Sequence, residues 1–162
     1  MLYSTGCREE AGMRQRVPPR WGSPARPHHV PRLLVEDDDP ALAVSDFSRF
    51  RQAGFEVAWC SGPAGNADDC SLLRNGECPL VKGADVVLHG LNPDTRIASA
   101  IRTAHPETGL VRIVRARAEV TDPGQGLREL AGSGCVLSGS DDVETQVRAL
   151  SRALPRRCPP SP

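Results

Sequence analysis

The sequence has no long hydrophobic run, almost no lysine and no excess of either charge. No apolar stretch approaches the roughly 20 residues of a membrane-spanning helix, and no apolar segment near the start resembles a signal peptide. We therefore expect a cytoplasmic protein without a membrane partner. Lys82 is the only lysine, and the 20 basic residues balance the 20 acidic ones. A neutral chain has no general attraction to nucleic acid, so we expect no nucleic-acid partner.

The 162 residues suffice for one domain with a hydrophobic core. Residues 1–31 are rich in Arg and Pro, without apolar periodicity, which predicts a disordered tail. His28 and His29 are interpreted as a solvated pair in that tail, and Met13 is an alternative start to Met1. Residues 157–162 form a second short tail, which leaves residues 32–156 as the domain.

Between the tails, apolar runs alternate with helical repeats. The runs predict strands over 32–35, 55–60, 84–91, 110–114 and 134–138. Helical periodicity predicts helices that begin at Pro40, Asp94, Leu127 and Asp141, and residues 61–80 are expected to be irregular. The predicted order is therefore a regular β/α alternation.

The first and last predicted helices show the clearest signals. Asp39 is a suitable N-cap, Pro40 suits the first turn, and Gly54 suits the end of the helix. Ser140 or Asp141 is expected to cap the last helix. The apolar residues expected to face the core are Ala43, Phe47 and Phe50 in the first helix, and Val143, Val147, Leu150 and Leu154 in the last.

Five β/α alternations with short connections predict a five-stranded parallel sheet covered on both faces. We expect a single α/β domain of the doubly wound, flavodoxin-like kind, with strand order 2-1-3-4-5. In such folds the chemistry lies at the carboxyl ends of the strands, where the strand order reverses. The acidic run Glu36, Asp37, Asp38, Asp39 follows the first strand, and His89 follows the third. Both are therefore predicted to lie at this edge.

Four segments resemble, in order, the receiver domain of two-component response regulators. They are "LLVEDDDPAL", "AGFEVAWC", "ADVVLHGL" and "DDVETQVRALSRAL", and the resemblance covers about residues 31–156. In that family, two acids after the first strand bind magnesium and an aspartate ending the third strand accepts a phosphoryl group. A Ser or Thr after the fourth strand and a Lys after the fifth contact the phosphoryl oxygens. These groups supply a nucleophile, a hard cation and hydrogen-bond donors.

Carried over position by position, the resemblance implies a degenerate site. The acids are Asp37 and Asp38, although the strand pattern also allows Glu36 and Asp37. The third-strand position falls on His89, which is not an aspartate. The Ser or Thr position after the fourth strand falls near Arg115, and this arginine would pair with Asp37. The Lys position after the fifth strand falls on Ser138 or Gly139, so no lysine is present there.

This pattern predicts a stand-alone pseudo-receiver that is not an enzyme and has no catalytic residue. It would signal by contact with a protein, either a sensor kinase, a downstream regulator or a second copy of itself. No cofactor is expected beyond weakly bound magnesium at Asp37 and Asp38. An atypical receiver that still accepts a phosphoryl group, with His89 as a candidate acceptor, is the alternative.

The six cysteines are Cys7, Cys60, Cys70, Cys78, Cys135 and Cys158. Without an export signal they are expected to be free thiols. The family resemblance does not explain the segment 61–80, which contains Cys70 and Cys78 and follows Cys60. Three interpretations stay open: packing of buried thiols, a redox pair such as Cys70 with Cys78, and a metal site completed by Cys135 or a histidine. The last two would make the protein a thiol or metal sensor.

Overall fold

The structure is a computed structural model that describes residues 21, 30–63, 69–91, 96–114 and 136–155. Its five strands are all parallel and lie in the order β2-β1-β3-β4-β5, as predicted. The strands are β1 (Arg32–Glu36), β2 (Glu56–Cys60), β3 (Val86–His89), β4 (Gly109–Val114) and β5 (Val136–Ser138). The helices are α1 (Pro40–Gln52), α2 (Ser71–Asn75), α3 (Pro79–Gly83), α4 (Ile97–Ala104) and α6 (Val143–Ala153).

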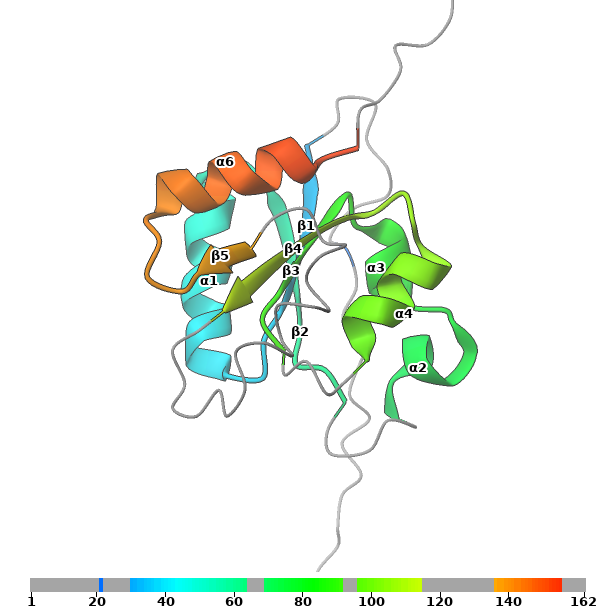
Figure 1. Cartoon of the computed structure of the whole chain (residues 1–162). Coiled ribbons are helices and arrows are strands. Elements are labelled where there is room, and N and C mark those ends of the chain that lie inside the picture. The colour runs from blue at the N-terminus through cyan, green and yellow to red at the C-terminus, as the bar shows by residue number, and fades with distance from the viewer. Residues whose placement is uncertain (1–20, 22–29, 64–68, 92–95, 115–135, 156–162) are drawn as a thin grey trace, which may run out of the picture.

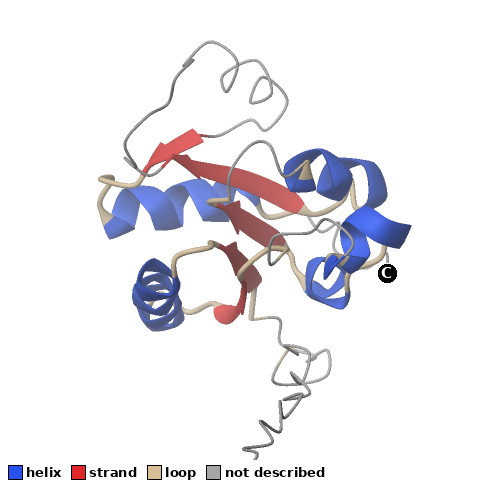
Figure 2. Ribbon diagram, turned by 90° about the horizontal axis from the view of Figure 1, so that it is seen from below, coloured by secondary structure: helices blue, strands red, loops and turns tan. Residues whose placement is uncertain are grey.

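Helices cover both faces of the sheet (Figures 1 and 2). Helices α1 and α6 pack on one face, around the buried side chains of Phe50 and Leu150. Helices α2, α3 and α4 pack on the other, around Leu72, Val81 and Ile101. Because strand residues alternate between the two faces, each central strand is apolar on both sides, which explains its continuous hydrophobic run.

The start of α1 follows the sequence prediction. Asp39 is the N-cap, and its carboxylate accepts from the backbone N–H groups of Ala41 at 2.9 Å and Leu42 at 3.5 Å. Pro40 occupies the first turn, where its missing N–H costs no hydrogen bond. Gly54, just after the helix, adopts a φ of +94°, a conformation that is sterically unfavourable for residues with a Cβ atom.

The segment predicted to be irregular contains two short helices instead. Pro79 begins α3, and Gly76 ends α2 in a left-handed conformation. Leu72, Leu80 and Val81 are buried against the sheet. The prediction failed because a helix of five residues is too short to show helical periodicity and is stabilised by tertiary packing.

Helix α6 is capped one residue later than predicted. The side chain of Asp142 accepts from the N–H of Thr145 at 2.7 Å, while the carboxylate of Asp141 accepts from the N–H of Ser138. Val143 is exposed rather than buried, since it stands at the first position of the helix. Gln146 is fully buried instead, because hydrogen bonds to Arg49 and to the carbonyl of Asp141 satisfy its amide.

Other sequence predictions fall partly or wholly outside the described residues: the helix at Leu127–Ala131, the two tails, the helix start at Asp94, the first residues of the strand 134–138 and the candidate metal ligand Cys135. From the first tail, Trp21 is described, and its indole donates to the carbonyl of Leu80 at 3.1 Å. The guanidinium of Arg32 lies over the Trp21 ring. Within the described parts of the chain, no helix has the length and apolarity to cross a membrane.

Candidate functional site

Four polar side chains form a row across the carboxyl end of the sheet. Glu36 at the end of β1 pairs in register with Cys60 on one side and with His89 on the other. His89 in turn pairs with Arg112 of β4. Paired residues in neighbouring strands project to the same face, and this is the face that α2, α3 and α4 cover. A thiol, a carboxylate, an imidazole and a guanidinium are therefore neighbours.

Glu36 and His89 form a buried pair within this row. Nδ1 of His89 lies 2.7 Å from Oε2 of Glu36, and the two side chains are 1% and 3% exposed, respectively. A carboxylate removed from water needs such a partner. The contact also orients the imidazole, because it occupies one ring nitrogen and leaves Nε2 on the other side of the ring. The sequence did not indicate this pair, since its members are 53 positions apart.

Asp37, the next residue, has Gly90 rather than His89 beside its carboxylate. Asp37 is 1% exposed, and its Oδ1 accepts from the N–H of Asp39 at 2.9 Å. A Cβ atom added to Gly90 would lie 3.0 Å from Oδ2 of Asp37. The β3-end position that faces the Asp37 carboxylate is thus Gly90, where the sequence interpretation had placed His89. Strand β3 ends at His89, two residues before the predicted end, and because His89 pairs in register with Glu36, Gly90 follows beside Asp37.

The four consecutive acids consequently have four separate environments. Glu36 pairs with His89, Asp37 is buried beside Gly90, Asp38 is exposed, and Asp39 caps α1. Among the described residues, no three His, Cys, Asp or Glu side chains are grouped to hold a metal ion. Gly90 offers no carboxylate to complete such a group. Weak magnesium binding by Asp37 and Asp38 stays a prediction for which the described residues supply no third acidic ligand.

The other predicted site residues belong to other strands or turns, or are not described. Ser138 ends β5 and is exposed, and its hydroxyl lies 2.8 Å from that of Ser140 within the turn toward α6. Lys82 is in α3, directly before β3, and so lies at the edge where the strands begin rather than where they end. Arg115, the predicted position after the fourth strand, lies outside the described residues. Gly139, the alternative to Ser138 after the fifth strand, donates its backbone N–H to the carbonyl of Val114.

Cys60, Cys70 and Cys78 are free thiols that pack against the core on the α2–α4 face. Burial raises the pKa of the Cys60 thiol to about 11, and the carboxylate of Glu36 adds to this effect. Cys70 and Cys78 stand directly before α2 and α3. A buried thiol with a raised pKa is a poor nucleophile and a poor metal ligand in its protonated form. These features favour the packing interpretation of Cys60.

Cys60 should therefore react slowly with N-ethylmaleimide. At pH 8 we expect its labelling to be at least about tenfold slower than that of Cys70 or Cys78, because the thiolate is the reactive form. The rate should keep rising toward pH 11, since a raised pKa moves thiolate formation to higher pH. Peptide mass spectrometry after timed labelling measures each site. Labelling of Cys60 ahead of the other two would contradict the burial argument and favour the redox interpretation instead.

The comparisons with known proteins agree on the fold. No protein-family model and no curated protein matches the sequence. The non-phosphorylated HemR receiver domain from Leptospira biflexa superposes with a TM-score of 0.55 at 20% identity, over 80% of this chain and 98% of that one. A CheY-like receiver domain protein from Methanospirillum hungatei gives 0.56 at 15% identity, over 76% and 93%. The chain has the receiver fold. A receiver protein from Sinorhizobium medicae gives 0.54 at 20% identity, over 77% and 94%.

The receiver fold allows Asp37 and its neighbour Gly90 to be compared with the site positions of receiver domains. The resemblance stated from the sequence places the acidic cluster of receivers after the first strand and the phosphoacceptor after the third. In this receiver fold the corresponding strand ends bring together Asp37 and Gly90. His89 lies beside Glu36 on the face covered by α2, α3 and α4.

Proposed function

We propose that the protein is a non-enzymatic signalling module of the two-component type that works without phosphorylation of the receiver site. The observation that carries this proposal is that Gly90 faces the Asp37 carboxylate. A Cβ atom added to Gly90 would lie 3.0 Å from Oδ2 of Asp37. A glycine has no nucleophile, so the acyl phosphate of ordinary receivers has no place to form. Lys82 at the opposite edge supplies no donor to a phosphoryl group.

The exposed apolar residues support an action through protein contact. Of the described large apolar side chains that are exposed, Val114 at the end of β4 and Val136 in β5 project to the same face of the sheet, and Val143 begins α6 on the opposite face. Apolar side chains in contact with water mark surfaces that bind partners when they gather in one place. We propose that a sensor kinase, a downstream regulator or a second copy of the chain binds at Val114 and Val136. A cytoplasmic location stays a prediction.

Incubation with acetyl phosphate and magnesium tests the proposal. We expect the intact mass to stay unchanged, while a receiver domain with an aspartate at this position gains one phosphoryl group under the same conditions. Asp37→Asn and His89→Gln variants are treated in parallel. An adduct that appears in the native chain would overturn the proposal. Its loss in His89→Gln, together with lability in acid, would identify His89 as an atypical phosphoryl acceptor.

A further inference from the structure

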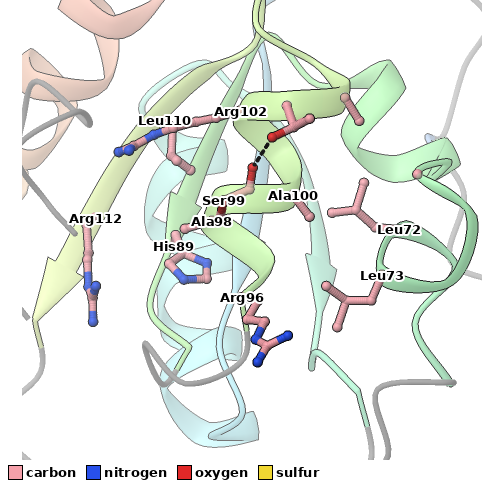
Figure 3. Close-up of a pocket in the computed structure, with 13 residues that line it drawn as sticks. Leu72, Leu73, His89, Arg96, Ala98, Ser99, Ala100, Arg102, Leu110 and Arg112 are labelled. Carbon is pink, nitrogen blue, oxygen red and sulfur yellow. Dashed lines mark hydrogen bonds between the residues drawn. The ribbon is translucent and has the colours of Figure 1, made fainter.

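A cavity of about 750 Å³ opens between α2, α4 and the carboxyl ends of β3 and β4. Figure 3 shows His89 and Arg112 to one side of α4, Arg96 just before this helix, and Leu72 and Leu73 of α2 to its other side. The cavity is on the α2–α4 face of the sheet and is separate from the contact between Asp37 and Gly90. Its volume falls in the range of pockets that hold small organic molecules.

His89 brings an unsatisfied polar atom to this cavity. The residue is 1% exposed, and its Nε2 has no hydrogen-bond partner among the described residues. Nδ1 is occupied by Glu36, so the ring cannot turn to satisfy Nε2 without breaking the buried pair. Buried polar groups without partners are rare and require an explanation. A ligand that hydrogen-bonds to Nε2 would supply it.

The remaining polar lining is basic. Arg96, Arg102 and Arg112 line the cavity, and none of its described lining residues is acidic. The N-terminus of α4 adds partial positive charge: its N-cap residue Arg96 makes no side-chain capping bond, and the second and third residues of the helix, Ala98 and Ser99, line the cavity. Leu72 and Leu73 form an apolar wall. The site thus combines positive groups at one end with an apolar surface at the other.

We propose that this cavity binds a small organic oxyanion. Its phosphate or carboxylate group would contact Nε2 of His89, the guanidinium of Arg112 and the N-terminus of α4, and its apolar part would lie against Leu72 and Leu73. With Nδ1–H donating to the Glu36 carboxylate, Nε2 is left as an acceptor, which a hydroxyl group of the ligand, such as the P–OH of a singly protonated phosphate, would satisfy. This binding does not depend on the proposed lack of phosphorylation, because the two sites share no contacting atom.

Phenyl phosphate, which has both an anionic and an apolar part, tests the site. We expect it to shift the ring signals of His89 in a saturable way in NMR spectra of the full chain, and the variant His89→Gln assigns those signals among the four histidines. That variant should bind about tenfold more weakly, because a hydrogen bond to a charged group is lost. Phenol, which lacks the charge, should cause no saturable shift. Benzoate shows whether a carboxylate serves as well as a phosphate.

Two arginine variants provide the matched control. Arg96→Gln should weaken phenyl phosphate binding about threefold, whereas Arg152→Gln on α6, across the sheet, should leave it unchanged. Arg96 is exposed, so its variant should fold even if His89→Gln does not. Absence of any shift at His89, equal weakening by both arginine variants, or equal binding of phenol would each overturn the proposal.

Discussion

Replacing His89 with leucine should lower the free energy of unfolding by about 3–5 kcal/mol. The substitution removes the partner of a carboxylate that is 3% exposed, and the contact that it breaks is 2.7 Å long. Leucine has a similar volume and sits well in a sheet core, so lost packing contributes little. The loss comes from leaving Glu36 buried without a compensating group. Urea unfolding, followed by circular dichroism and by Trp fluorescence, measures it.

A second histidine provides the control for this variant. His105 is also buried, but its Nδ1 lies 3.7 Å from Glu107, whose side chain is 70% exposed. His105→Leu should cost less than about 1 kcal/mol, because water still solvates the carboxylate that it leaves behind. The double variant Glu36→Leu/His89→Leu should recover most of the stability, since replacing both members of a buried pair is often neutral. If His89→Leu were as mild as His105→Leu, the buried pair would not be a stabilising unit.

The acidic run shows which features can be predicted from the sequence: the N-cap Asp39 could be predicted, whereas the buried contact of Glu36 with His89 could not. The strands and their order were predictable, because the runs at 32–35 and 84–91 are apolar on both faces and only a parallel sheet buries both. Asp39 and Pro40 were predictable because capping is a local property. The pairing of Glu36 with His89 depends on the register between β1 and β3, which no local pattern encodes.

The same limit explains the misplaced strand end. From Ala84 to Leu91 the sequence is apolar apart from Asp85 and His89, so periodicity gave no sign that β3 ends at His89. A shift of one residue moves a side chain to the opposite face. Whether His89 or Gly90 faces Asp37 therefore depends on the register between β1 and β3, which pairs Glu36 with His89 and so places Gly90 beside Asp37.

Placing an aspartate at Gly90 should make the stability of the fold depend on magnesium. Without the ion, Gly90→Asp should lose about 1–3 kcal/mol. Its Cβ would be 3.0 Å from Oδ2 of Asp37, 3.1 Å from the carbonyl of Glu36 and 3.2 Å from a methyl group of Ile113. The added carboxylate would also repel that of Asp37. Magnesium bridges such oxygens, and an ion at about 100 times its dissociation constant returns about 2.7 kcal/mol.

Unfolding in urea with EDTA and then with magnesium chloride measures this gain, and Gly90→Asn is the matched control. The asparagine has the same shape without the charge, so it should show the steric loss but little response to magnesium. His89→Asp distinguishes the two candidate positions. At residue 89 the new carboxylate would be buried beside Glu36 and away from Asp37, so we expect a larger loss of stability and no recovery with magnesium. If magnesium instead stabilised His89→Asp and left Gly90→Asp unchanged, residue 89 would be the position that faces Asp37, and the proposal based on Gly90 would fail.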